Sequence, residues 1–166
     1  MSLTDFIDEA EIDPIDLVET IANHNAWEFD RVAHDQIAMA VEGQWRTYSI
    51  TLAWSGHDET LRLICTFEMD PHEERLAALY ETLNSVNDSC WSGGFTYWHE
   101  QRLMVWRYGL VLSGGQTANP EQIDRLIGTA VGTSERFYPA FQLVTWGGRS
   151  PEEAIQVAIA EAYGRA

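Results

Sequence analysis

Residues 45–68, with the sequence WRTYSITLAWSGHDETLRLICTFE, decide the fold of this chain. Two runs in this stretch alternate between apolar and polar side chains, which is typical of strands with one buried face. The turn composition of SGHD (55–58) separates the runs, so we expect them to pair as antiparallel neighbours. The apolar positions are Tyr48, Ile50, Leu52 and Trp54 in the first run and Leu61, Leu63, Cys65 and Phe67 in the second.

Further strands are predicted on both sides of this pair. Ile37, Met39 and Val41 alternate with polar or small residues and predict a strand just before it. Residues 27–32 are interpreted as an additional edge strand. Two aromatic-rich runs within residues 91–112, separated by a polar corner at 99–101, indicate a hairpin.

Proline marks four predicted helix starts. In each case a capping side chain precedes the proline, and an acid or amide follows two residues after it. The motifs are DPID (13–16), DPHE (70–73), NPEQ (119–122) and SPEE (150–153). They predict helices over 14–23 and 71–87, a third that runs from 120 through Pro139 to Gly147-Gly148, and a fourth that begins after Ser150.

The order of these elements predicts an α+β fold: an antiparallel sheet with helices packed on it. With 166 residues, 45% of them hydrophobic, the chain is expected to form one domain over residues 13–166. Residues 1–12 form an acidic lead. Nine acids lie in the first thirty residues, and no basic residue precedes Arg31. A flexible, solvated tail and a docking site for a basic partner are the two interpretations of this lead.

Charge and composition exclude several classes of function. The formal net charge of −16 would repel a phosphate backbone and an anionic membrane surface, so no nucleic-acid or membrane partner is expected. The chain contains no lysine, which excludes a P-loop and Schiff-base chemistry. No catalytic motif, cofactor motif or metal-ligand spacing occurs, so no catalytic, cofactor-binding or metal-binding residue is assigned.

The two cysteines, Cys65 and Cys90, are too few and too far apart for a redox pair or a zinc site. Cys65 lies at an apolar position of its strand and is expected to be a buried thiol. No stretch has the roughly 18 apolar residues of a membrane span, and the first residues lack the basic start of a signal peptide. A cytoplasmic location is therefore expected.

Five residues are candidates for binding a protein partner. Arg62 and Ile64 are predicted on the sheet face opposite Leu61 and Leu63, and sequential strand pairing would set Trp45 beside them. Arginine beside aromatic side chains is common in interfaces, whereas a solvated sheet face is the alternative. Trp106 is included because tryptophan is enriched at interfaces, with core packing as its alternative. Arg107 completes the set; its alternative is an internal ion pair with an acid.

Several landmarks together resemble the YbjN family of bacterial proteins, over residues 14–160. The likeness rests on the strands before the second helix, on Arg107, and on the order and spacing of short motifs. These motifs are LNSVN (83–87), GF (94–95), FYPA (137–140), WG (146–147) and SPEEA (150–154).

The resemblance implies a fold similar to that of type III secretion chaperones, commonly as a homodimer, in a family described as sensory-transduction regulators. It implies no catalytic residue. We therefore expect a non-enzymatic regulatory or chaperone-like adaptor that binds a segment of another protein through a sheet face or an exposed edge. The alternative is a small-molecule sensor or enzyme with an aromatic-lined pocket.

Overall fold

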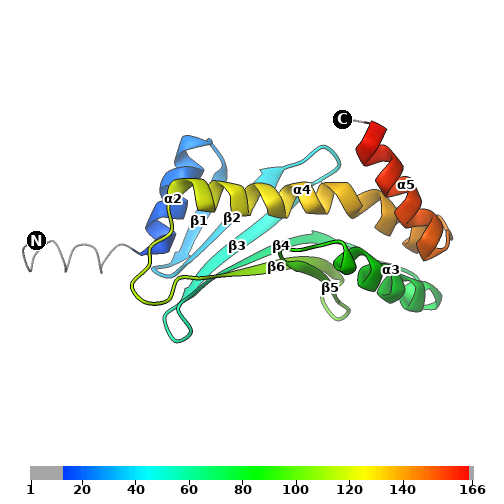
Figure 1. Ribbon diagram of the computed structural model, residues 1–166, viewed down its shortest axis with the longest axis horizontal. Coiled ribbons are helices and arrows are strands. Elements are labelled where there is room, and N and C mark those ends of the chain that lie inside the picture. Colours follow the sequence, from blue (N-terminus) through cyan, green and yellow to red (C-terminus); the bar gives the residue numbers. More distant parts are fainter. Residues whose placement is uncertain (1–12, 165–166) are drawn as a thin grey trace, which may run out of the picture.

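The computed structural model describes residues 13–164 and shows a curved sheet with helices packed on it (Figure 1). The predicted acidic lead over residues 1–12 lies outside the described residues. The first half of the chain forms α2 (Pro14–His24), β1 (Glu28–Ala33), β2 (Gln36–Glu42), β3 (Thr47–Ser55) and β4 (Thr60–Glu68). The second half forms the 3-10 turn η1 (Glu73–Arg75), α3 (Leu76–Asp88), β5 (Gly94–Trp98), β6 (Leu103–Val111), α4 (Pro120–Thr145) and α5 (Pro151–Gly164).

The sheet is antiparallel throughout, with the strand order β1-β2-β3-β4-β6-β5. The predicted α+β fold is therefore confirmed, as are the edge strand near residues 27–32 and the hairpin within residues 91–112. β3 and β4 pair as neighbours, with Ile50 opposite Cys65. β6 pairs with β4 as well as with β5, and Trp106 lies opposite Cys65. The last hairpin thus continues the sheet, with its second strand next to β4.

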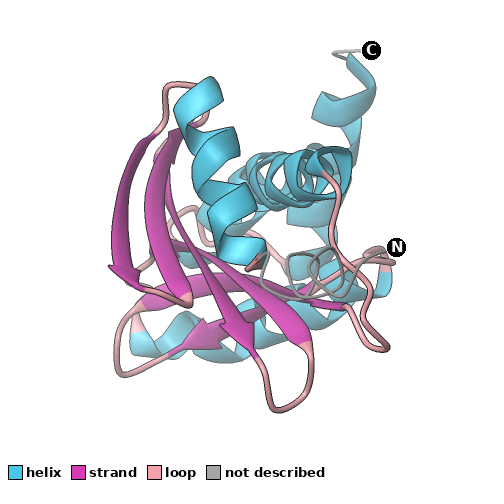
Figure 2. Cartoon of the chain, turned by 90° about the vertical axis from the view of Figure 1, so that its left-hand side faces the viewer, coloured by secondary structure: helices cyan, strands magenta, loops and turns pink. Residues whose placement is uncertain are grey.

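One face of the sheet curves around α4 (Figure 2), and each of the other described α-helices, α2, α3 and α5, also contacts α4. The face toward α4 buries the apolar residue at every second strand position, as the alternation predicts. We call the opposite side the outer face. The buried side chains of α4 that cover the sheet are Ile123, Leu126, Ile127, Ala130, Phe137, Ala140, Phe141 and Val144.

A carboxylate on α4 anchors the turn between β2 and β3. The Tyr48 hydroxyl donates to Glu135 Oε1 at 2.7 Å, and the backbone N–H of Trp45 donates to the same oxygen at 3.2 Å. A Cβ atom at Gly43 would lie 2.1 Å from this oxygen, so a larger residue there would have to displace the Glu135 carboxylate. Burial and the nearby Glu135 raise the pKa of Tyr48, which keeps the hydroxyl protonated as the donor.

Three of the four proline motifs begin helices as predicted. The prediction for the second motif is wrong in detail. Asn119 and Gln122 form a complete capping box at the start of α4, and α4 continues through Pro139 to Thr145. At the second motif, Asp70 does not cap a helix, because its carboxylate pairs with Arg102 at 2.5 Å. A 3-10 turn follows instead, and α3 begins only at Leu76.

The side chain of Asn87, near the end of α3, pairs with the outer edge of β5. Its Oδ1 accepts from the Phe95 N–H at 2.7 Å, and its Nδ2 donates to the Phe95 carbonyl at 2.9 Å. A single amide side chain therefore takes the place that a neighbouring strand would fill at Phe95.

Replacing Asn87 with alanine is expected to lower the free energy of unfolding by about 1 to 3 kcal/mol, because two partly buried backbone groups lose their partners. Denaturant titration would measure the loss. Asn84→Ala is the matched control, since Asn84 is exposed on the same helix. Equal stability of the two variants would show that Asn87 does not hold the edge.

Cys65 is buried on the α4 side of β4, which confirms the predicted buried thiol. Its Sγ atom lies 3.7 Å from the hydroxyl of Ser134 on α4. Burial raises the pKa of the Cys65 thiol to about 12. The thiol is therefore protonated and unreactive near neutral pH.

This raised pKa predicts a loss of stability at alkaline pH. Between the ordinary thiol value of 9.0 and about 12, the unfolded chain has released the proton that the folded chain keeps. The free energy of unfolding is therefore expected to fall above pH 9, by up to about 1 kcal/mol per pH unit. Denaturant titrations from pH 8 to pH 10 would show this slope in the wild type and a smaller one in Cys65→Ala. Identical slopes would contradict the assignment.

Candidate functional site

Three of the predicted site residues lie together on the outer face of the sheet. Ile64 on β4 is directly opposite Arg107 on β6, and Arg62 is opposite Gly109 in the same ladder. Arg62 and Arg107 are exposed, and Ile64 is half-buried between strands. The predicted placement of Arg62 and Ile64 on the face opposite Leu61 and Leu63 is confirmed.

The other two predicted residues lie elsewhere. Trp45 precedes β3 in the turn that Glu135 anchors and is 43% exposed. Its predicted position beside Arg62 and Ile64 is wrong, because the register sets Ala53 and Thr51 opposite those residues. Trp106 is fully buried on the α4 side of the sheet. Arg107 has no carboxylate partner among the side chains of residues 13–160, so its predicted alternative as an internal ion pair does not hold there.

β6 is longer than β5, and this difference shapes the region around Arg107. The ladder between them ends at the pair formed by Gly94 and Arg107, whereas β6 continues to Val111. Residues 108–111 of β6 therefore have β4 on one side and no strand on the other. We call this stretch of β6 the open edge.

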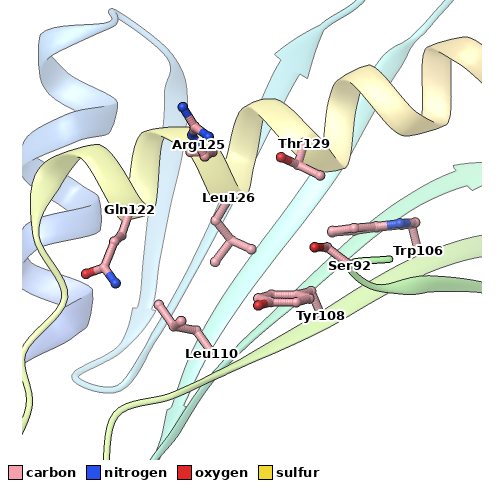
Figure 3. A pocket seen from close by; sticks show the side chains of 8 residues that line it. All are labelled: Ser92, Trp106, Tyr108, Leu110, Gln122, Arg125, Leu126 and Thr129. Atoms are coloured by element: carbon pink, nitrogen blue, oxygen red, sulfur yellow. The ribbon is translucent and has the colours of Figure 1, made fainter. Parts of the chain in front are cut away.

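Two hollows flank the open edge, one on each face of the sheet. The first, which we call the outer hollow, has a volume of about 640 Å³ and is lined by Thr60, Arg62, Leu63, Ile64, Gly93, Arg107, Tyr108 and Gly109. The second, which we call the inner pocket, has a volume of about 200 Å³ and lies between β6 and α4 (Figure 3). The inner pocket is lined by Ser92, Trp106, Tyr108, Leu110, Gln122, Arg125, Leu126 and Thr129.

The inner pocket has an aromatic wall. The rings of Trp106 and Tyr108 are nearly parallel, at 14°, with centroids 6.2 Å apart. Trp106 Nε1 is the only buried side-chain nitrogen or oxygen without a hydrogen-bond partner among the described residues. Leu110 and Leu126 add apolar surface from β6 and α4, and Arg125 lies on α4 beside them (Figure 3). The pocket can therefore take an apolar group, with a cation nearby.

The sequence analysis did not identify most of this pocket. Tyr108 and Leu110 follow Trp106 at intervals of two, so the alternation of β6 could have placed all three on one face. Leu126 and Arg125 come from α4, which joins the site only through tertiary packing.

Gly93 ends the β5 ladder and packs on the wall of the inner pocket. A Cβ atom at Gly93 would lie 2.3 Å from a ring carbon of Trp106, and the residue has a φ of +74°. Both observations require glycine. The preceding residue, Ser92, contributes to the pocket rim, and Trp91 is fully exposed beside it.

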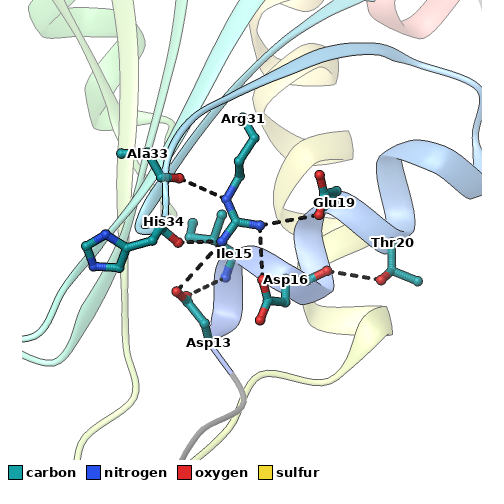
Figure 4. A network of polar contacts seen from close by, with 8 residues as sticks. All are labelled: Asp13, Ile15, Asp16, Glu19, Thr20, Arg31, Ala33 and His34. Atoms are coloured by element: carbon teal, nitrogen blue, oxygen red, sulfur yellow. Dashed lines mark hydrogen bonds and ion pairs between the residues drawn. The ribbon is translucent and has the colours of Figure 1, made fainter.

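The opposite edge of the sheet, β1, is guarded by charge and by an irregular ladder. Arg31 reaches from β1 to α2 and pairs with Asp13, Asp16 and Glu19 (Figure 4). The Arg31 guanidinium also donates to the carbonyls of Ala33 and His34. The register shifts between Arg31 and Ala33, and such bulges and charges protect strand edges from pairing with other chains.

Neither a metal centre nor a membrane helix is found within residues 13–164. The described residues hold no group of three or more histidine, cysteine, aspartate or glutamate side chains arranged for a metal ion. In the same range, every helix is too short or too polar to cross a membrane.

Comparisons with known proteins identify a family and a similar solved structure. The model of the YbjN family, described as "Putative bacterial sensory transduction regulator", matches residues 14–143. A crystal structure of "YbjN, a putative transcription regulator from E. coli" has the same fold, with a TM-score of 0.51 at 14% sequence identity. That likeness covers 91% of this chain and 92% of the other chain. No curated protein matches the sequence.

Gly93→Ala is expected to destabilise the protein by about 2 to 5 kcal/mol, because the added methyl group meets the Trp106 ring in a left-handed conformation. Gly114→Ala is the matched control. Gly114 has a φ of +71°, and nothing lies within 4 Å of its added Cβ, so only the backbone cost of about 1 kcal/mol applies. Thermal and denaturant unfolding would measure both. Equal losses would show that the contact with Trp106 does not constrain the chain.

Proposed function

This chain belongs to the YbjN family, and we propose that it acts as a non-enzymatic regulatory or chaperone-like adaptor that binds a segment of another protein. The proposal includes a homodimer as the working assembly. Sensory transduction, the role by which the family is described, requires a protein to pass a signal to a partner. A protein-binding surface is the simplest device for doing so.

The observation that supports the proposal best is the cluster of Arg62, Ile64 and Arg107 on the outer face. Their strands bring two exposed cations to a half-buried apolar side chain, beside the outer hollow. Arginine around an apolar centre is a common composition of protein interfaces. Trp45 would be a second contact with the partner at the far end of β3. Trp106 is fully buried and would contribute only as part of the wall of the inner pocket.

The charge of the chain favours a protein target over DNA. The similar E. coli structure is called a transcription regulator, but the present chain has a formal net charge of −16. Direct binding to DNA would need many cations that neutralise phosphates, and the ten arginines face 26 acids. A regulator of this composition would act by binding another protein.

The inner pocket favours a second candidate, a small-molecule sensor. Its aromatic wall of Trp106 and Tyr108 could hold a small planar ligand. The volume of about 200 Å³ is below the usual range of ligand pockets, which makes this the second choice.

Affinity capture of the tagged protein from its native lysate, with mass spectrometry, tests the proposal. A stoichiometric partner is expected. Ile64→Ala and Arg107→Glu are expected to lower its recovery about ten-fold while the melting temperature changes little, since both side chains reach the surface. Arg149→Glu is the control, because it reverses a charge on the loop before α5.

Three results would contradict the proposal. Equal recovery with all variants would exclude the outer-face cluster as the binding surface. Unfolding of Ile64→Ala would assign that residue to the core. A clean protein without any partner, combined with a metabolite that raises the melting temperature, would favour the sensor. Light scattering on the same preparation would test the homodimer.

A further inference from the structure

We propose that the open edge of β6 binds an extended peptide as an added strand, with acidic side chains on the outer face and an apolar side chain in the inner pocket. The inference rests on the proposed function, because it names where the partner segment would bind and which chemistry that segment needs.

The hydrogen bonds around Asn87 determine which backbone groups of β6 are open. The Phe95 N–H and carbonyl both point to Asn87. The backbone N–H and carbonyl of the adjacent residue, Gly94, therefore point the other way, toward Arg107. Backbone N–H and carbonyl groups alternate in direction from one residue of a strand to the next. Those of Gly109 and Val111 therefore point to the same side of β6 as those of Arg107. Gly109 and Val111 each have an N–H and a carbonyl beyond the end of β5, and these groups have no hydrogen-bond partner within the described residues.

The open edge is accessible. Gly109 is exposed, and Val111 is 63% exposed. The chain that precedes β5 cannot extend the ladder there, because Gly93 turns it away against the Trp106 ring. The outer edge of β5 is covered by Asn87 at Phe95, and β1 is guarded by Arg31. The open edge is thus the place where the described sheet can accept a new strand.

Side chains of an added strand would alternate between the two hollows. A residue opposite Leu110 would point to the α4 side, where Trp106, Tyr108, Leu110 and Leu126 form an apolar wall (Figure 3). Its neighbours, opposite Gly109 and Val111, would point to the outer face and the outer hollow. The lack of a side chain at Gly109 lets another backbone approach closely.

Charge determines the chemistry of the partner. Arg107 on the outer face and Arg125 on α4 have no carboxylate partner among the described residues, although acids outnumber arginines by 26 to 10 in the chain. Arg62, which also lines the outer hollow, is already paired with Asp58 at 2.6 Å and lowers the pKa of that carboxyl. Unpaired cations on both sides of the open edge favour acidic side chains in the peptide.

Selection from a displayed library of random 12-residue peptides tests this inference. Enriched peptides are expected to alternate acidic and apolar residues. Fluorescence anisotropy of the best peptide, synthesised with a label, would then give dissociation constants. Val111→Pro is expected to weaken binding about ten-fold, because proline removes the outward N–H, whereas Val111→Ala keeps this donor and is the matched control. Arg107→Glu is expected to weaken binding by a similar factor.

Hydrogen exchange provides a second readout that does not depend on a variant. Peptide binding is expected to slow exchange at the amides of Gly109 and Val111 at least about ten-fold, and to leave that of Val32 on β1 unchanged. Unchanged exchange at Gly109 and Val111 in the presence of saturating peptide would overturn the inference.

The remaining outcomes separate this inference from the proposed function. Peptides that bind Val111→Pro normally but fail to bind Ile64→Ala would overturn the added strand and leave partner binding intact. If no peptide is enriched but a partner is captured from the lysate, the added strand would again be overturned and partner binding would remain supported. A lower molecular mass of Val111→Pro by light scattering would assign the edge to a second copy of the chain and overturn the peptide.

Discussion

Packing of α4 along the curved face of the sheet is the interaction on which the rest of the structure depends. The strands present an apolar side chain at every second position, and without α4 this face would be exposed to water. Phe67 on β4 makes ring contacts with Tyr138 and Phe141 of α4, and Phe95 on β5 contacts Phe137 and Phe141. The same helix carries Glu135 to the turn between β2 and β3. α4 therefore holds both halves of the sheet in one curvature.

The candidate site follows from the difference in length between β5 and β6. β6 pairs along the whole length of β4, but β5 begins only at Gly94, because Gly93 must turn where it meets Trp106. Beyond that point neither β5 nor α3 covers β6, and the inner pocket and the outer hollow remain on its two faces. A contact that limits the length of one strand thus exposes the backbone of the next. The residues that shape the site are for this reason mainly core residues, with only Arg62, Arg107 and Arg125 contributing charge from the surface.

The few cations of this acidic chain have distinct uses. Arg31 joins α2 to β1 through three carboxylates, and Arg75 donates to the carbonyls of Val144 and Arg149, which ties α3 to the end of α4. These arginines support the fold. Arg107 and Arg125 have no such contact among the described residues, although carboxylates are abundant. A structural role explains the first group and does not explain the second, which is why the second group is assigned to recognition.

The sequence by itself determined the elements and the two faces of each strand. Alternation in residues 45–68 is a local property. It correctly placed Arg62 and Ile64 on one face of the sheet and Leu61 and Leu63 on the other face. Capping side chains and proline are equally local, and they located α2, α4 and α5. Only the tertiary structure decided that β6 lies beside β4, that Trp45 is far from Arg62, and that Asp70 pairs with Arg102 rather than capping a helix. Register and long-range pairing depend on how separate segments pack together, and no periodicity within a single segment contains that information.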